Sequence, residues 1–224
     1  MIGIIGAMDI EIEKINAVME NKEEYTISGA LYTKGTLHGK DVVTAVCGIG
    51  KVFAAMCAQT MIVKFGADKV INTGVAGGLT DKTDILDTVV ATALVQHDMD
   101  TTYFGDPKGM ISGINVVEFS CDESLAEKIA ENTEGNVVRG IVASGDCFVA
   151  DENKKKDIAD TFNAVACEME GASIAQVCYV NKVPFAVLRT ISDGANGAEM
   201  SYEKFRVEAA DKAAKVILKT IEVI

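Results

Sequence analysis

Residues 70–78 read Val70-Ile71-Asn72-Thr73-Gly74-Val75-Ala76-Gly77-Gly78, an apolar run that passes directly into a glycine-rich turn. A short apolar run bounded by a turn signal is typical of a strand buried on both faces. Strands of that kind belong mainly to parallel sheets that helices cover on both sides. This segment therefore predicts an α/β fold.

Strand and helix patterns alternate along the chain on both sides of this segment. We expect strands at 2–5, 88–95, 137–143, 164–168 and 184–192, β-like runs at 26–33 and 41–47, and helices at 9–21, 51–65, 122–132, 151–161, 171–181 and from about Ser201 to the end. Residues 98–113 are expected to form a long loop. This alternation predicts a central mixed, largely parallel sheet flanked by helices on both sides.

Apolar spacing also predicts which helix faces are buried. In the first helix the inward residues are expected to be Ile12, Ile15, Val18 and Met19. In the helix at 51–65 they are expected to be Phe53, Met56, Cys57, Thr60 and Met61.

Composition indicates one domain over residues 1–224, because 49% of the 224 residues are hydrophobic and 24% are charged. Only Pro107 and Pro184 interrupt the chain as prolines, and no Gly/Ser/Pro-rich stretch is long enough for a linker. The formal net charge of −12 opposes binding to a phosphate backbone or an anionic membrane. Nucleic acid and membranes are therefore not expected as partners.

Three features predict a soluble cytoplasmic protein. Residues 1–8 carry no basic leader before the acidic Asp9 and Glu11, and no apolar run approaches the roughly 20 residues that cross a bilayer. The six cysteines show no CxxC pair and no Cys/His cluster of zinc spacing. We expect reduced, buried thiols, with no metal and no cofactor.

Acids and glycines collect where the expected strands end. The segments concerned are GAMDIE at 6–11, NTGVAGG at 72–78, SGDCF at 144–148, CEMEG at 167–171 and ISDGANG at 191–197. In α/β proteins ligands bind outside the carboxyl ends of the strands. We therefore expect a ligand site built from these five segments.

Several familiar motifs are absent or weak. The segment Gly3-Ile4-Ile5-Gly6 lacks the GxGxxG dinucleotide pattern, and Gly48-Ile49-Gly50-Lys51 lacks the Walker pattern. The run His97-Asp98-Met99-Asp100 could hold a metal, but it suits a strand end entering a loop equally well. His38 and His97 are the only histidines, so acid–base chemistry must depend mainly on carboxylates.

An ordered set of motifs carries a family resemblance. In chain order they are Gly6-Ala7-Met8 followed by Glu11, Gly48-Ile49-Gly50-Lys51, Asn72 to Gly78, Ser144-Gly145-Asp146-Cys147-Phe148, Glu168-Met169-Glu170 and Arg189-Thr190-Ile191-Ser192-Asp193. This set resembles the methylthioadenosine/S-adenosylhomocysteine nucleosidases of the purine nucleoside phosphorylase superfamily. The resemblance implies a nucleoside phosphorylase-like fold and hydrolysis of adenine thionucleosides to adenine and the thioribose, a step of methionine salvage. It also implies a homodimer and no cofactor.

The chemistry itself sets three requirements. Breaking a ribosyl–adenine bond passes through an oxocarbenium-like sugar, so the site needs a proton donor for the base and a carboxylate to activate water. It also needs a group that holds the ribose hydroxyls. By resemblance, Asp193 protonates purine N7 with Ser192 positioning it, Glu170 binds the 2′- and 3′-hydroxyls, and Glu11 activates water with the aid of Arg189.

An ordinary aspartate with a pKa of ~3.9 is almost fully ionised at pH 7. We therefore expect burial and a hydrogen bond to raise the pKa of Asp193. Judged alone, Asp193 suits a turn before Gly194, and Glu11, Glu168 and Glu170 suit the first turns of helices, where the helix dipole favours acids.

The resemblance assigns further residues to substrate binding. Phe148 stacks on adenine, the main chain of Val149 reads its edge, and Met169 packs against the sugar. Met8, Ile49 and Tyr202 line the rest of the pocket, and Phe104 of a second subunit closes over the alkylthio end. In this family the residue after Asn-Thr-Gly is often serine, whereas here it is Val75, so we expect water positioning to depend more on Glu11 and Arg189.

Two other functions stay open on the sequence. A phosphorylase on the same fold would let phosphate attack the sugar, but Arg189 is the only arginine among the motifs and Glu11 would repel phosphate. A non-catalytic nucleoside-binding protein would keep the pocket without the chemistry. Related 6-amino nucleosides such as aminodeoxyfutalosine are not separated from methylthioadenosine by the sequence.

Overall fold

The computed structural model describes residues 1–194 and 198–224. Its strands are β1 (Ile2–Gly6), β2 (Glu20–Ile27), β3 (Ala30–Leu37), β4 (Lys40–Val46), β5 (Lys69–Gly78), β6 (Thr88–Gln96), β7 (Phe119–Ser120), β8 (Val137–Ser144), β9 (Ala164–Glu168) and β10 (Phe185–Asp193). Its helices are α1 (Asp9–Val18), α2 (Lys51–Phe65), the 3-10 turn η1 (Thr102–Phe104), α3 (Glu123–Glu131), α4 (Glu152–Phe162), α5 (Gly171–Asn181) and α6 (Ala198–Val223).

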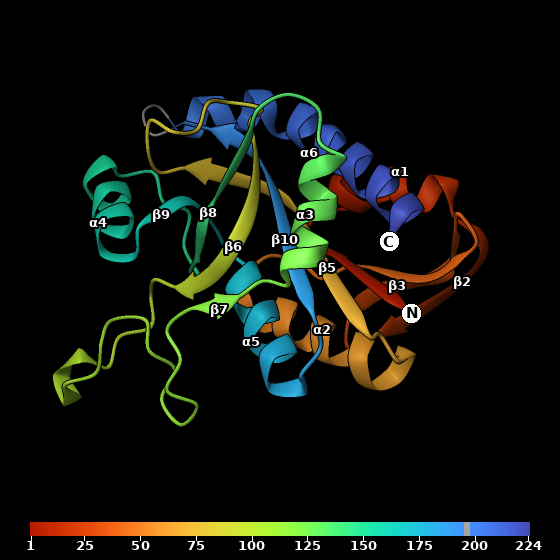
Figure 1. Cartoon of the computed structure of the whole chain (residues 1–224), viewed down its shortest axis with the longest axis horizontal. Coiled ribbons are helices and arrows are strands. Elements are labelled where there is room, and N and C mark those ends of the chain that lie inside the picture. The colour runs from red at the N-terminus through yellow and green to blue at the C-terminus, as the bar shows by residue number, and fades with distance from the viewer. Residues whose placement is uncertain (195–197) are drawn as a thin grey trace.

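The strands form one mixed sheet, as predicted (Figure 1). Parallel pairings join β1 to β4 and β5, β5 to β10, β6 to β8, and β8 to β9. Antiparallel pairings extend the sheet from β4 through β3 to β2 and join β10 to β6. The apolar runs of β1, β5 and β10 lie at its centre, where both faces are buried.

Five of the strands close into a ring. The pairings run from β5 to β10, then to β6, β8 and β9. β9 then pairs antiparallel with the end of β5, with Cys167 opposite Gly77, and this pairing closes the ring. The strands β5 and β10 run opposite to β8 and β9, so their carboxyl ends would lie apart in an open sheet. Ring closure brings Gly77, Glu168 and Asp193 to one place.

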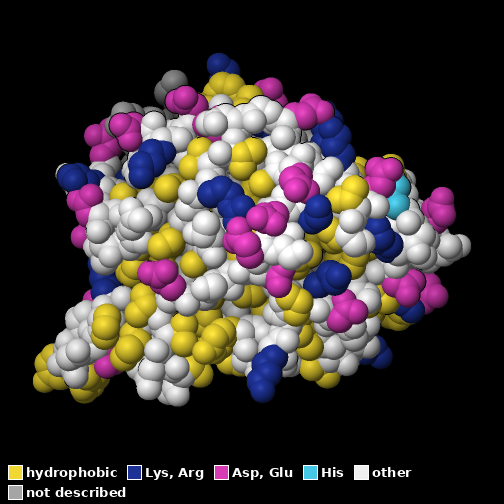
Figure 2. Space-filling view, viewed as in Figure 1, with side chains coloured by type: hydrophobic (Ala, Val, Ile, Leu, Met, Phe, Trp, Pro, Cys, Tyr) yellow, Lys and Arg dark blue, Asp and Glu magenta, His cyan; other side chains and the backbone are white. Residues whose placement is uncertain are grey.

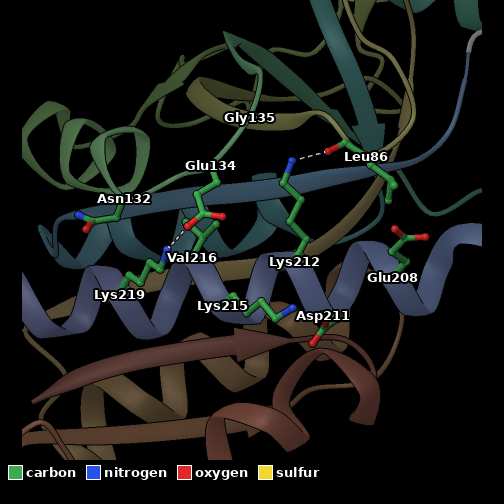
Figure 3. A pocket seen from close by; sticks show the side chains of 10 residues that line it. All are labelled: Leu86, Asn132, Glu134, Gly135, Glu208, Asp211, Lys212, Lys215, Val216 and Lys219. Carbon is green, nitrogen blue, oxygen red and sulfur yellow. Dashed lines mark hydrogen bonds and ion pairs between the residues drawn. The ribbon is translucent and has the colours of Figure 1, made fainter.

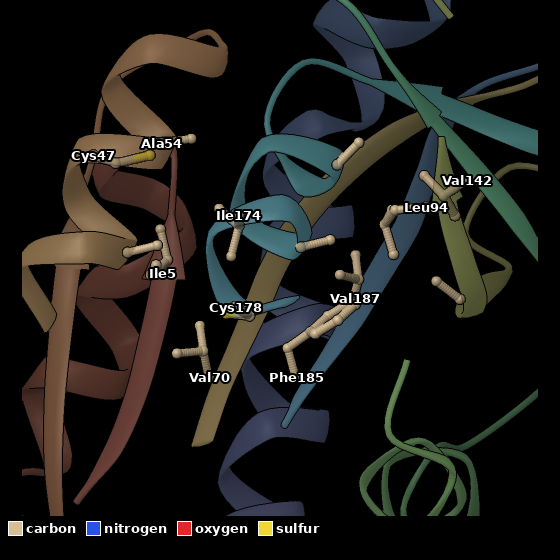
Figure 4. Close-up of a cluster of buried hydrophobic side chains, with 14 of the residues drawn as sticks. Ile5, Cys47, Ala54, Val70, Leu94, Val142, Ile174, Cys178, Phe185 and Val187 are labelled. Carbon is tan, nitrogen blue, oxygen red and sulfur yellow. The ribbon is translucent and has the colours of Figure 1, made fainter. Parts of the chain in front are cut away.

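Helices cover both faces of the sheet. α1, α3 and α6 pack on one face and α2 and α5 on the other, while α4 packs against β8 and β9. The interior between the sheet and the pair α2 and α5 is filled by small and branched side chains such as Ala54, Ile174 and Val187 (Figure 4). Each fully buried Val, Ile or Leu contributes roughly 1.5–3 kcal/mol, so this core anchors the strand ends that carry the site.

The N-terminal third differs from the sequence-based expectation. The first helix ends at Val18 rather than at residue 21, and β2 begins at Glu20. The β-like run expected at 26–33 contains the turn between β2 and β3, because Ser28 and Gly29 both have positive φ (51° and 82°). Two such residues form the turn that a tight antiparallel hairpin requires.

The expected inward faces are also partly wrong. Val18, Phe53 and Met56 are 55%, 54% and 42% exposed, whereas Ala54 and Ala58 are buried. α2 is apolar all round, so its spacing could not show which side meets the sheet. The loop expected at 98–113 contains η1, which stands away from the body of the molecule where Figure 2 shows hydrophobic side chains gathered at the surface.

Within the residues described, no helix has the length and apolar character that crossing a bilayer demands. The six cysteines are free thiols, and four of them are buried.

Candidate functional site

One cavity of about 350 Å³ lies where α1 begins and where β5, β9 and β10 end. We call it the acid cavity. It is lined by Ala7, Met8, Glu11, Ile49, Val75, Ala76, Gly77, Phe148, Cys167, Glu168, Met169, Glu170, Ser192, Asp193 and Tyr202. The three acids Glu11, Glu170 and Asp193, which the sequence places in three separate motifs, therefore meet around one space.

Glu11 is held by main-chain donors. Its Oε2 accepts hydrogen bonds from the N–H groups of Ala7 (2.7 Å) and Met8 (3.0 Å), and its Oε1 accepts one from Val75 (3.2 Å). The side chain is only 3% exposed. Three N–H donors fix both oxygens in place, as a group that must orient a small reactant requires.

The pKa of Glu11 is raised by burial, against the opposing effects of Arg189 and the three N–H donors. A carboxylate with a raised pKa is a stronger base than one in water. Glu11 therefore combines a fixed position with increased basicity.

Gly74 lets Glu11 and Arg189 approach the strand closely. A β-carbon at position 74 would lie 2.6 Å from Glu11 Oε1 and 2.8 Å from Arg189 Nη1. Both contacts are shorter than side chains tolerate, so the glycine of the Asn-Thr-Gly segment is required for packing at the site.

Arg189 lies behind the acids rather than at the surface of the cavity. It is 2% exposed, and its Nη2 donates to Asn72 Oδ1 at 2.5 Å and to Glu168 Oε2. The nearest oxygen of Glu170 is 3.9 Å from Nη2. Since a buried guanidinium needs carboxylate partners, Arg189 and Glu168 form a charge pair that supports the neighbouring acids.

Glu168 and Glu170 have different environments although they are two residues apart. Glu168 accepts hydrogen bonds from Arg189, from Ser144 and from the N–H groups of Glu170 and Gly171, so its oxygens are fully used within the protein. Glu170 accepts only the N–H of Gly50, at 2.9 Å on Oε1, among the hydrogen bonds of the residues described. Its other oxygen is left for a ligand.

Burial and the nearby Glu168 carboxylate raise the pKa of Glu170 well above its usual range. Such a carboxyl gains from partners that donate hydrogen bonds to its free oxygen. Hydroxyl groups of a ligand are partners of this kind.

Asp193 ends β10 and is 2% exposed. Its Oδ1 accepts a hydrogen bond from Ser192 Oγ at 3.0 Å, and its Oδ2 lies 3.5 Å from Lys155 Nζ. Burial raises the pKa of Asp193, as expected. The expectation that a hydrogen bond adds to this rise is wrong, because the bond from Ser192 favours the carboxylate and lowers the pKa, as Lys155 also does.

Apolar and aromatic side chains line the rest of the cavity. Met8, Ile49, Phe148, Met169 and Tyr202, all expected from the sequence to contact substrate, lie on its wall. The rings of Phe148 and Tyr202 meet edge to face with centroids 5.6 Å apart. Phe148 is 51% exposed, so its ring is available to a ligand.

Two expected binding residues lie outside the acid cavity. Val149 is buried and lines a small adjoining hollow of about 40 Å³, which also reaches Asp193. Phe104 lies in η1, is 80% exposed and contributes nothing to the cavity of its own chain.

The sequence reasoning missed Lys155, which contacts the site through Asp193. The signal was present, because Lys155 is in helical phase with Ile158 and Phe162, the buried residues of α4. A lysine at an apolar position of a helix needs a buried partner, and here the partner is Asp193.

The segments 48–51 and 97–100, which match no phosphate-binding or metal motif, form hydrogen bonds within the protein. Lys51 Nζ donates to Asp98 Oδ1 at 2.6 Å, and the Lys51 N–H donates to the Asp146 carboxylate. The Asp146 N–H in turn donates to the Asp98 carboxylate. Asp100 accepts from the N–H of Thr102 at 2.9 Å. Asp98 and Asp146 thus join the loops at 48–51, 97–100 and 144–148, whereas the contact of Asp100 is local.

A second hollow, of about 530 Å³, lies between α6 and the loop at 132–135 (Figure 3). We call it the α6 groove, and it is lined by Leu86, Asn132, Glu134, Gly135, Glu208, Asp211, Lys212, Lys215, Val216 and Lys219. Its three lysines bind the carbonyl of Leu86, Asp211 and Glu134. The three acids of the α6 groove are exposed or partly exposed, unlike the buried acids of the acid cavity.

Known proteins are similar to this chain in both sequence and fold. The model of the phosphorylase superfamily matches residues 1–222. The 5′-methylthioadenosine/S-adenosylhomocysteine nucleosidase of Bacillus cereus (strain G9842) is 39% identical over 227 residues, which cover 99% of this chain and 98% of that protein.

Solved structures agree with this relationship. The 5′-methylthioadenosine/S-adenosylhomocysteine nucleosidase of Neisseria meningitidis in complex with methylthio-immucillin-A superposes with a TM-score of 0.96 at 35% identity, covering 100% of this chain and 99% of that one. The native futalosine hydrolase of Helicobacter pylori strain 26695 superposes with a TM-score of 0.95 at 38% identity, covering 100% and 97%.

Proposed function

The chain belongs to the phosphorylase superfamily and, within it, to the 5′-methylthioadenosine/S-adenosylhomocysteine nucleosidases, and from this premise we propose that it is an N-glycosyl hydrolase of adenine thionucleosides. Its substrates are 5′-methylthioadenosine and S-adenosylhomocysteine, and its products are adenine and the corresponding thioribose. The observation that carries this function is the meeting of Glu11, Glu170 and Asp193 around one cavity.

Each acid has an environment suited to one part of the reaction. Asp193 delivers a proton to N7 of the purine as the C1′–N9 bond breaks and its electron pair moves to the base. Glu170 accepts hydrogen bonds from the ribose hydroxyls with its free oxygen. Glu11 takes a proton from water as the water oxygen bonds to C1′, so that charge and protons balance.

The other residues support these steps. Ser192 holds Oδ1 of Asp193, and Arg189 acts through Glu168 and Glu170 rather than by touching the reactants. Phe148 and Tyr202 pack on the adenine, with Val149 presenting main chain at its edge. Met169 packs on the sugar, and Met8 and Ile49 line the 5′ side.

Water is a better nucleophile than phosphate for this cavity. Among the residues that the structure describes, no lysine or arginine lines the acid cavity, and Arg189 is paired behind it. A phosphate dianion beside Glu11 and Glu170 would meet like charge, and the nearby guanidinium of Arg189 is already paired with Glu168. The cavity therefore supports hydrolysis over phosphorolysis.

Incubation with methylthioadenosine, with and without phosphate, tests the function. We expect free adenine and methylthioribose at equal rates in both conditions, measured by chromatography. A sugar phosphate that forms only with phosphate would establish a phosphorylase instead. Tight binding of methylthioadenosine by calorimetry without adenine release would establish a binding protein.

Substrate breadth needs its own comparison, because a futalosine hydrolase superposes as well as a thionucleoside hydrolase. The ratio of kcat/KM for methylthioadenosine, S-adenosylhomocysteine and aminodeoxyfutalosine measures it. We expect the thionucleosides to be preferred, since Met8 and Ile49 line the 5′ side with apolar surface.

We also propose that the chain forms a homodimer through an apolar surface of α2. Val52, Phe53, Met56 and Val63 are between 42% and 73% exposed on this one helix, and Phe104 is exposed on η1. Apolar side chains exposed together mark interaction surfaces. In the dimer, Phe104 of one copy closes the 5′ end of the other copy's cavity.

Sedimentation tests the homodimer. We expect Phe53→Asp to give a monomer that has lost activity, while Val207→Asp, at an exposed position on α6, stays dimeric. Phe104→Ala should keep the dimer and raise KM for methylthioadenosine. A monomeric parent protein with full activity would overturn this proposal.

A cytoplasmic location is the remaining proposal. Six free thiols fit a reducing compartment. Fractionation of the source cells, with the chain followed by antibody, tests it.

A further inference from the structure

Lys155 is a buried cation that the proposed reaction does not use. It is 2% exposed, while its neighbours Lys154 and Lys156 on α4 are exposed. Its Nζ donates to the carbonyl of Gly194 at 2.6 Å and lies 3.5 Å from Asp193 Oδ2. A lysine is almost never fully buried without a partner, and both contacts of Lys155 are at the end of β10.

The surroundings of Asp193 leave Lys155 as its charged partner. Among the residues described, the acids Glu11, Glu168 and Glu170 line the same cavity as Asp193. Cys167 from β9 and Tyr202 from α6 also face Asp193. Burial raises the pKa of the Cys167 thiol to about 12 and raises the pKa of the Tyr202 phenol, so both are neutral at neutral pH. Within the described part of the chain, Lys155 is thus the cation that can stabilise negative charge on Asp193.

We propose that Lys155 is a positioning residue for the proton donor: it holds the end of β10 through Gly194 and stabilises the Asp193 carboxylate that forms when the proton leaves. This inference rests on the proposed role of Asp193. Before the transfer the pair is a neutral acid beside an ammonium, and after it a carboxylate beside the same ammonium. The proton and the electron pair of the C1′–N9 bond both move to the purine, and Lys155 keeps its own protons.

Burial and Lys155 act on the donor in opposite directions. Burial raises the pKa of Asp193, and the Lys155 ammonium lowers it. A general acid works best when its pKa is close to the working pH, so a donor subject to both effects is better than one that is only buried. Lys155 therefore adjusts the strength of the acid.

The pH dependence of kcat/KM with methylthioadenosine tests the inference, because its alkaline limb follows loss of the donor's proton. Lys155→Met keeps the chain length without the charge, and Lys155→Gln keeps a donor for Gly194 if the methionine variant does not fold. An opposite charge at this distance lowers a carboxyl pKa by about 1–3. We expect either variant to shift the alkaline limb upward by about one pH unit or more, with kcat about 10-fold lower and KM little changed.

Matched variants separate this role from a structural one. Lys155→Arg should keep the limb close to its original position, and Lys156→Met, at the exposed neighbour, should behave as the parent protein. A riboside with a 4-nitrophenolate leaving group needs no proton, so any hydrolysis of it should be equal in Lys155→Met and the parent. An unchanged limb in both Lys155→Met and Lys155→Gln, with loss of thermal stability alone, would overturn the inference.

Failure of the proposed function gives a different result. If Asp193→Asn still releases adenine at the parent rate, Asp193 is not the donor and the premise is lost. If Asp193→Asn is inactive while the Lys155 variants keep the parent profile, only the role of Lys155 is wrong.

Discussion

The acid cavity and the α6 groove are both hollows rich in charged side chains, and the larger of the two is the groove, at about 530 Å³ against about 350 Å³. The difference between them is burial. In the groove, Lys219 and Glu134 are 50% and 85% exposed, whereas Glu11, Glu170 and Asp193 are 3%, 6% and 2% exposed. Burial raises the pKa of all three carboxyl groups of the acid cavity, so burial rather than size or charge content marks the reactive site.

The largest effect is expected from Glu11, the acid held by three main-chain donors. Glu11→Gln should lower hydrolysis of methylthioadenosine by about 10³-fold or more, since general base catalysis is worth ~10²–10⁴. Binding of a non-hydrolysed substrate analogue, measured by calorimetry, should persist. Appreciable turnover in this variant would mean that another group activates water.

Asp193→Asn should lower kcat by at least ~100-fold, because the amide cannot supply the proton for the departing base. Single-turnover measurement of adenine release checks this value. Near-normal turnover would remove Asp193 from the mechanism and make the burial of this acid unrelated to catalysis.

Gly74→Ala should have a smaller effect that acts through the geometry of the site. The added methyl group would lie 2.6 Å from Glu11 Oε1 and 2.8 Å from Arg189 Nη1, so these groups must move. We expect kcat to fall about 10-fold, and stability by about 1–3 kcal/mol as in other overpacked sites. Gly29→Ala, at a turn glycine with open space around it, is the control for activity.

Glu170→Gln sharpens the comparison through pH. The pKa of Glu170 is raised in the folded protein, so the folded protein keeps the carboxyl proton at pH values where the unfolded chain has lost it. The stability of the parent protein therefore falls as pH rises from about 4.5 toward the folded pKa. Glutamine has no such proton. The melting temperature of the variant relative to the parent should therefore rise between pH 5 and pH 8, by about 2–4 °C per kcal/mol.

Scanning calorimetry at both pH values measures this difference. An equal difference between parent and variant at pH 5 and pH 8 would contradict the raised pKa. Glu134→Gln, an exposed acid of the α6 groove, should show almost no pH-dependent difference and serves as the control.

The smallest effect is expected in the groove itself. Lys219→Ala removes an exposed ion pair with Glu134, and such pairs contribute about 0–1 kcal/mol. Adenine release should stay at the parent rate and the melting temperature should change by no more than about 2–4 °C. A large loss of activity would show that the groove takes part in function despite its exposure.

The sheet and its helices could be predicted from the sequence because buried strands and amphipathic helices have clear periodicities. The β2–β3 turn was missed because Ser28-Gly29 lies inside a run that also suits a single strand. The face of α2 was assigned wrongly because a helix that is apolar on every side has no preferred face in its spacing. Both errors concern segments whose pattern is ambiguous.

The acids of the cavity were selected from ordered motifs, but their partners could not be. That Glu168 is used by Arg189 while Glu170 keeps a free oxygen depends on the antiparallel pairing of β9 with the end of β5. No local pattern shows that pairing. Lys155 is an intermediate case. The sequence shows that it lies on the apolar face of α4, but its partner Asp193 is 38 residues away and can be identified only from the fold.

The anchoring of Glu11 has a consequence for sequence drift. Because N–H groups of residues 7, 8 and 75 hold this carboxylate, its position depends on the backbone conformation and not on the side chains of those residues. A valine at position 75 satisfies the anchor as well as a hydroxyl residue would. The side chain at position 75 can therefore change without loss of this anchor.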